Sequence, residues 1–187
     1  IFIKNIKKKN VLSNWEFNGW AKYKNFKNDN KAYLKVSKFN KLKVVKPKYN
    51  KKNIVLEGGS IDVNGNGLIL TTMECLLSKV QQRNKGLNKS DYNTIFGKYF
   101  GTRKVIWLNK GIYGDDTHGH VDDIARFVSK NKIFMAIEKN KKDKNFKNLQ
   151  ENINIVKKFK KENKEKLKII NIPMPAPKFI DGIRLPA

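Results

Sequence analysis

A strand–strand–helix–strand order appears twice along this chain, and the repeat restricts the folds that it can adopt. Residues 64–67 read Asn-Gly-Asn-Gly between two short apolar segments, which predicts a β-hairpin because Asn and Gly tolerate positive φ. A helix from Ser90, as its N-cap, to Gly101 and a buried strand over 105–108 complete the first unit. Three apolar strands and one amphipathic helix form the second unit, over 124–128, 133–137, 146–159 and 167–172. Two β-β-α-β units predict an α/β fold built from modules, not one doubly wound sheet.

The composition indicates one globular domain without a membrane span. Of the 187 residues, 39% are apolar and 11% aromatic, enough for one domain with a core. No apolar run reaches the ~20 residues that a membrane helix needs, and no secretory signal pattern opens the chain. The single cysteine, Cys75, excludes an internal disulfide and fits a reducing compartment, so we expect a cytoplasmic protein. Because the chain starts without methionine and stops without a polar tail, we expect 1–187 to be a single catalytic-type domain, incomplete at both ends.

The formal charge of +25 raises the alternative of a basic single-stranded nucleic-acid-binding domain. Trp15, Phe17 and Trp20 could stack on bases, and their alternation with small or polar residues predicts a half-buried strand. The distribution of charge opposes this alternative. Lysines are spread along nearly the whole chain and arginine is scarce, whereas nucleic-acid-binding surfaces cluster their charge and favour arginine. We therefore expect no nucleic-acid partner.

The segment from Gly114 to Asp123 concentrates the side chains that carry chemistry. It reads GDDTHGHVDD and holds both histidines of the chain and four of its 16 acidic residues. Acidic and imidazole groups close together in a strongly basic sequence predict either a metal site or an acid–base site that receives a cation.

A metal site is the second-ranked alternative. His118 and His120 are two residues apart, so on a strand both side chains would point to the same face, together with Asp116 and Asp122. The chain supplies no third histidine and no cysteine pair to complete such a site. Oxygen-rich groups without a defined spacing are weak evidence for a metal.

An acid–base site uses the same alternation differently. His120 and Asp122 would converge on one substrate, and Glu57, between an apolar segment and two glycines, could supply a second carboxylate. A carboxylate binds a planar guanidinium through two parallel N–H bonds. A nearby histidine can protonate a leaving amine and then deprotonate water. Cys75 has no histidine near it in the sequence, so we interpret it as a small buried side chain and not as a nucleophile.

Several motifs, in a fixed order, carry a resemblance to a known family. They are LEGGSI at 56–61, LTT at 70–72, CLL at 75–77, KVIWL at 104–108, GDDTHGHVDD at 114–123 and MPAP at 174–177. From Trp15 to the last residue, the chain resembles the agmatine deiminase family, which also contains the bacterial peptidylarginine deiminases.

The resemblance implies a pentein-type fold, an α/β propeller of five β-β-α-β modules, of which this chain would hold the middle modules. It implies a hydrolase of guanidine C–N bonds that converts agmatine and water to N-carbamoylputrescine and ammonia in putrescine biosynthesis. Peptidylarginine is the alternative substrate. The implied partner is a small cationic guanidine such as agmatine, without a membrane, and with a homo-oligomer as a possible assembly.

By the same resemblance, His120 is the general acid and base and Asp122 binds the guanidinium. Glu57 supports the histidine and the substrate. Asp116 is a further expected substrate contact. A cysteine thiolate attacks the guanidinium carbon in this family, but that cysteine would lie beyond the end of this chain, and Cys75 aligns with a non-catalytic position. We therefore expect residues 1–187 alone to be inactive. The resemblance implies no metal and no organic cofactor.

Overall fold

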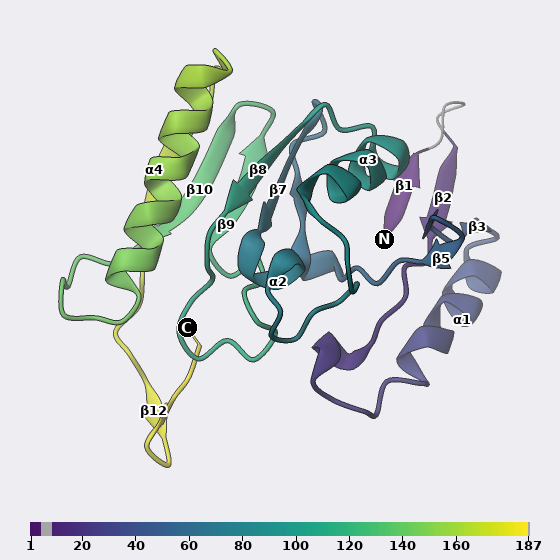
Figure 1. Ribbon diagram of the computed structural model, residues 1–187, viewed down its shortest axis with the longest axis horizontal. Helices are drawn as coiled ribbons and strands as arrows, with labels where there is room; N and C mark the ends of the chain where they lie inside the picture. Colours follow the sequence, from purple (N-terminus) through teal and green to yellow (C-terminus); the bar gives the residue numbers. More distant parts are fainter. Residues whose placement is uncertain (5–8, 187) are drawn as a thin grey trace.

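The computed structural model describes residues 1–4 and 9–186 and shows a mixed α/β fold made of three successive units (Figure 1). In each unit two antiparallel strands are followed by helical structure and by a third strand, which pairs in parallel with the second. The second strand is therefore the middle strand of each three-stranded sheet. The helical segment makes the crossover that parallel neighbours require. The units follow one another across the molecule, from β1 and β2 on one side to β10 and α4 on the other (Figure 1).

The N-terminal unit contains β1 (Phe2–Lys4), β2 (Asn10–Ser13), α1 (Ala32–Phe39) and β3 (Lys43–Val45). No residue of α1 is buried, and Phe39 is 88% exposed. The predicted strand over 15–20 is wrong: Glu16 makes one isolated bridge to Val55, and a 3-10 turn then covers Gly19–Ala21. A short hairpin leads to the next unit through β4 (Lys48–Tyr49) and β5 (Lys52–Asn53).

The middle unit contains β6 (Asp62–Val63), β7 (Leu68–Thr72), α2 (Met73–Leu77), α3 (Lys89–Phe100) and β8 (Lys104–Leu108). β6 and β7 form the predicted hairpin, in which Gly65 and Gly67 have φ angles of 66° and 86°. Thr72 caps α2, because its side-chain oxygen accepts the backbone N–H of Cys75 at 3.0 Å. The hairpin and the cap both involve residues within a few positions of one another, and the hairpin follows from the sequence.

The C-terminal unit contains β9 (Ala125–Ser129), β10 (Lys132–Ile137), α4 (Phe146–Glu162) and β11 (Lys168–Pro173). A hairpin of β12 (Phe179–Ile180) and β13 (Ile183–Arg184) then projects from the body of the molecule (Figure 1). Arg184 anchors this hairpin by an ion pair with Asp143 at 2.8 Å. Within the part of the chain that the structure describes, no helix is long and apolar enough to cross a membrane.

β7 is buried on both faces and divides the core into two clusters. Leu68 and Leu70 point into a cluster with the apolar stripe of α4, and Ile69 points into a second cluster with α3, as the two-residue period of a strand requires. The end of β7 is therefore fixed from both sides. α2 begins at this fixed point and carries Cys75, which is fully buried.

α3 begins at Asn88 as its N-cap, two residues before the predicted Ser90. The Asn88 Oδ1 accepts the backbone N–H groups of Ser90 and Asp91 at 2.8 and 3.2 Å. In return, the carboxylate of Asp91 accepts the backbone N–H of Asn88 at 2.9 Å. This capping box requires an acceptor three residues after the cap. Asn88 has one in Asp91, whereas the Oδ1 of Asn93, at the same spacing from Ser90, instead accepts the indole N–H of Trp107 at 3.3 Å.

Asn88→Ala is expected to lower the free energy of unfolding by about 1 kcal/mol, because it leaves the first backbone N–H groups of α3 without their acceptor. Ser90→Ala is the matched control, and it should change the free energy by less than about 0.5 kcal/mol, as is usual for an exposed side chain. Urea unfolding of both variants measures the difference. A loss at Ser90 as large as the loss at Asn88 would contradict the assigned cap.

Candidate active site

Glu57 lies at the start of a 3-10 turn over residues 58–60, directly after a buried apolar segment. Its carboxylate is buried and is paired with Arg83, whose Nε donates to Oε1 at 3.1 Å and to Oε2 at 3.4 Å. Burial alone would raise the pKa of Glu57. The neighbouring His120 and the Arg83 guanidinium more than offset burial and hold the pKa below its ordinary value.

Arg83 ties three segments of the chain together, although no sequence motif predicts this role. Its side chain is fully buried, and besides Glu57 it donates from Nη1 to the backbone carbonyl of Gln81 at 2.9 Å and from Nη2 to the carbonyl of Thr117. The pair therefore joins the turn at 57–60 to the segment at 114–123. The sequence contains one weak signal for this role. Only four of the 41 basic residues are arginines, so a position that has arginine and not lysine is unusual in this chain.

Arg83→Met is expected to lower the free energy of unfolding by about 3–5 kcal/mol, because it leaves a buried carboxylate without its partner. Arg126→Met is the matched control. Arg126 lies 3.6 Å from Asp62 and 3.9 Å from Asp122, but its own side chain is 53% exposed, and loss of a pair with such an exposed guanidinium costs about 1 kcal/mol or less. Urea unfolding compares the two variants. An equal decrease in the free energy of unfolding would show that the buried Arg83 pair stabilises the fold no more than the exposed Arg126 pair.

The segment 114–123 folds as a series of turns around Asp115 and does not form the strand assumed in its alternating pattern. The Asp115 carboxylate accepts the backbone N–H groups of Thr117, Gly119 and His120 at 2.8, 2.7 and 3.2 Å. Burial would raise the pKa of Asp115, but bonds from Thr117 and these backbone groups offset it and keep the pKa low. Gly114, His118 and Gly119 have positive φ angles of 94°, 64° and 86°, which a strand does not allow.

These turns place His120 between two carboxylates. Its Nε2 lies 3.5 Å from Oε2 of Glu57, and its Nδ1 lies 3.9 Å from Oδ1 of Asp122. The backbone N–H groups of Val121 and Asp122 donate to the carbonyl of Gly59 at 3.0 and 3.3 Å, which holds the two turns together. The predicted proximity of Glu57, His120 and Asp122 is present, although turns and not a strand produce it.

Gly59 is the position where this close approach requires glycine. A Cβ atom at this residue would lie 2.5 Å from the His120 Nδ1 and 2.9 Å from both carboxylate oxygens of Asp122. The bare backbone therefore lets the imidazole and the Asp122 carboxylate face each other across it. The two glycines that follow Glu57 in the sequence therefore include the residue that lets His120 and Asp122 come close to the backbone.

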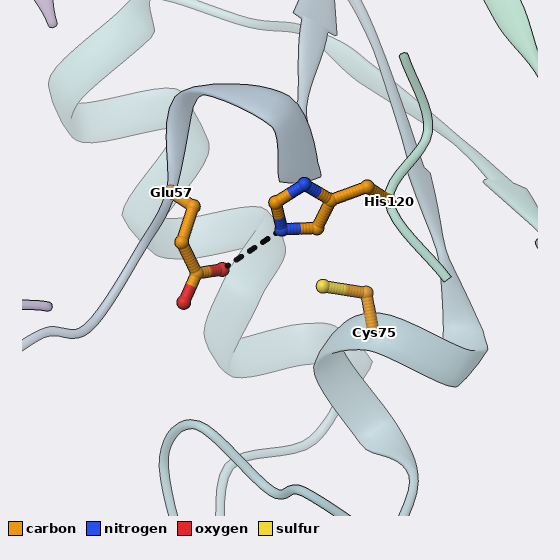
Figure 2. Close-up of side chains that lie close together, drawn as sticks. All are labelled: Glu57, Cys75 and His120. Atoms are coloured by element: carbon orange, nitrogen blue, oxygen red, sulfur yellow. Dashed lines mark ion pairs between the residues drawn. The ribbon is translucent and has the colours of Figure 1, made fainter. Parts of the chain in front are cut away.

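Cys75 is a third buried group beside Glu57 and His120, and the sequence gives no sign of this proximity. One ligand atom from each of the three side chains lies within 4.8 Å of the others, and Figure 2 shows the thiol beside the carboxylate and the imidazole. Burial raises the pKa of the Cys75 thiol to about 12. The thiol is therefore neutral near pH 7, which fits the interpretation of a small buried side chain and not of an activated nucleophile.

Asp116 and His118 lie apart from this group. Asp116 is half exposed and accepts the hydroxyl of Tyr23 at 2.5 Å, with the Lys22 ammonium 3.7 Å away. The Nε2 of His118 lies 3.1 Å from the hydroxyl of Ser78. The alternative of a metal site with His118, His120, Asp116 and Asp122 on one strand face does not match the structure, because the turns direct the two imidazoles to different partners.

The aromatic residues of the nucleic-acid alternative do not form an exposed stacking surface. Trp15 is buried, stacks on Phe100 with ring centroids 5.3 Å apart, and belongs to the core cluster of the middle unit. Phe17 and Trp20 are half-buried and pack edge to face on each other. These side chains stabilise the fold, and their geometry gives no support to base stacking.

Comparison with known proteins adds independent information. A family model described as Porphyromonas-type peptidyl-arginine deiminase matches residues 1–187. The agmatine deiminase of Medicago truncatula is 34% identical over 172 residues, which are 89% of this chain and 44% of that protein. The agmatine deiminase of Pseudomonas syringae pv. syringae is 32% identical over 171 residues, 89% of this chain and 45% of that protein. The chain thus spans less than half the length of these curated relatives.

Solved structures of deiminases are also similar to this chain. A cysteine-to-serine variant of the C. jejuni agmatine deiminase with substrate bound superimposes with a TM-score of 0.82 at 34% identity. The match covers 96% of this chain and 50% of that structure.

Proposed function

The chain belongs to the Porphyromonas-type peptidyl-arginine deiminase family, and on this basis we propose that residues 1–187 supply the acid–base and guanidinium-binding part of a deiminase active site. The observation that carries the proposal is the position of His120 between Glu57 and Asp122. An imidazole flanked by two carboxylates can bind a cation and exchange protons with it.

The two carboxylates have different roles in this proposal. Glu57 is buried and fixed by Arg83, and its Oε2 faces one nitrogen of the imidazole at 3.5 Å. The side chain of Asp122 is 36% exposed and faces the other ring nitrogen, so it can accept N–H bonds from a guanidinium that enters from solvent. Asp116 lies nearer the surface, where its contact with Tyr23 and Lys22 would place it at the rim of the site.

The reaction proposed for the whole enzyme uses a thiolate that this segment does not provide. The thiolate adds to the guanidinium carbon and forms a C–S bond, and His120 protonates the departing nitrogen, which leaves as ammonia. His120 then takes a proton from water, the resulting hydroxide attacks the same carbon, and the C–S bond breaks to return the thiolate. The product carries a carbamoyl group in place of the guanidine.

Agmatine is the favoured substrate, because curated relatives that match 89% of this chain are named agmatine deiminases. The product would then be N-carbamoylputrescine, which leads to putrescine. The family description favours peptidylarginine as the alternative, and both substrates present the same guanidinium to Asp122. The common chemistry of the site is therefore a guanidine, and the distal part of the substrate distinguishes the two activities.

The three β-β-α-β units support a further proposal about the architecture. They would be consecutive modules of a five-module pentein propeller, because this chain covers 50% of the C. jejuni structure that it matches. Residues 1–187 would then form part of a single catalytic domain. The buried free thiol of Cys75 is compatible with the cytoplasm as its compartment.

The purified, metal-free 187-residue chain is expected to release no ammonia from agmatine, because the only thiol present is neutral and buried. A coupled ammonia assay measures this, with Cys75→Ala as the control for background. Ammonia release that depends on Cys75 would contradict the assignment of the nucleophile to another segment.

Asp122→Asn is expected to weaken agmatine binding about tenfold or more, because one charged hydrogen-bonding partner contributes about 1.5–3 kcal/mol. Asp29→Asn removes the same charge from an exposed turn and should leave binding unchanged. Isothermal titration calorimetry of both variants makes the comparison. Equal binding by Asp122→Asn and the unsubstituted chain would remove Asp122 from the site.

A further inference from the structure

Glu57, Cys75 and His120 come from three separate segments and meet at one buried point. One ligand atom of each side chain lies within 4.8 Å of the other two, and all three residues are buried. The Nε2 of His120 and Oε2 of Glu57 are 3.5 Å apart. In Figure 2 the thiol of Cys75 is directed toward the space beside these two atoms.

Nitrogen, sulfur and carboxylate oxygen are the ligand types that Zn²⁺ binds in proteins. With bond lengths of about 2.0–2.1 Å, two tetrahedral ligands of nitrogen and oxygen lie about 3.4 Å apart. The observed separation of 3.5 Å between Nε2 and Oε2 already matches this value. Movement of the Cys75 thiol, which lies within 4.8 Å of a ligand atom of each of the other two residues, would complete a three-ligand site.

An independent observation points to a ligand at the same place. The His120 side chain is only 10% exposed, and its Nε2 has no hydrogen-bond partner among the described residues. A buried polar atom without a partner costs free energy. The neighbouring Oε2 of Glu57 is also the oxygen farther from Arg83, whose Nε lies at 3.4 Å from it and at 3.1 Å from Oε1.

We infer that Glu57, Cys75 and His120 form a binding site for a thiophilic divalent cation of the Zn²⁺ class. Binding forms a metal–sulfur bond and releases the thiol proton to solvent, because thiol ligands bind zinc as thiolates. The thiolate and the carboxylate then balance the charge of the ion, while Arg83 keeps its contact with Oε1. The metal supplies the stabilisation that the buried thiolate lacks in its absence.

The site has an inhibitory consequence that rests on the proposed function. With a metal bound, Glu57 would be a ligand and could no longer orient the imidazole of His120. His120 would also be a ligand and could no longer exchange protons with a guanidine. The ion and the substrate would therefore exclude each other. Metal binding itself does not depend on the proposed activity, so direct binding measurements separate the two proposals.

The test uses the metal-free 187-residue chain titrated with Zn²⁺ by calorimetry and with Co²⁺ by absorption spectroscopy. We expect one ion per chain and a thiolate-to-cobalt charge-transfer band. Because the chain contains one cysteine, this band can come only from Cys75. Cys75→Ser should abolish the band and weaken Zn²⁺ binding by more than about 100-fold, since loss of even an outer partner of a ligand costs about 10–100-fold.

His118→Ala is the control for adventitious binding by a histidine outside the site, and it should keep both the band and the affinity. The absence of a cobalt–thiolate band in the unsubstituted chain would overturn the inference, whatever the fold of the variants. Zn²⁺ binding that survives in Cys75→Ser, or that is lost in His118→Ala, would also overturn it. Ammonia release from agmatine is not needed for any of these outcomes.

Discussion

The buried ion pair between Arg83 and Glu57 is the interaction on which the arrangement of the site depends. The Arg83 side chain is fully buried, and its Nη1 and Nη2 donate to the carbonyls of Gln81 and Thr117. A buried carboxylate is costly without a partner, so the guanidinium both permits Glu57 to stay charged and connects its turn to the segment that carries His120. The acid–base group is thus organised by a residue that takes no part in the proposed chemistry.

The fold was predictable where short-range signals decide it. The Asn-Gly turn, the cap at Thr72 and the left-handed Gly101 after α3 each involve residues within a few positions of one another. The apolar stripe of α4 is equally local, and the two repeated units follow from these elements. The N-cap of α3 was misplaced because both Asn88 and Ser90 are good capping residues, and only the partner at Asp91 selects between them.

The site was predictable only in part. Glu57, His120 and Asp122 lie together as expected, but the strand that was assumed to align them does not exist. Asp115 instead folds its own segment by accepting three backbone N–H groups, a pattern that a two-residue alternation conceals. The position of Cys75 beside His120 depends on the packing of α2 against residues far along the chain. No local pattern contains such long-range information.

Proton NMR of the histidine rings tests the central claim most directly, because the chain has only two histidines. Titration of the metal-free chain with agmatine should shift the ring resonances of His120 in a saturable way and leave those of His118 nearly unchanged. That result would place the guanidinium beside Glu57 and Asp122. Shifts confined to His118, or no saturable shift at His120, would contradict the account of the site.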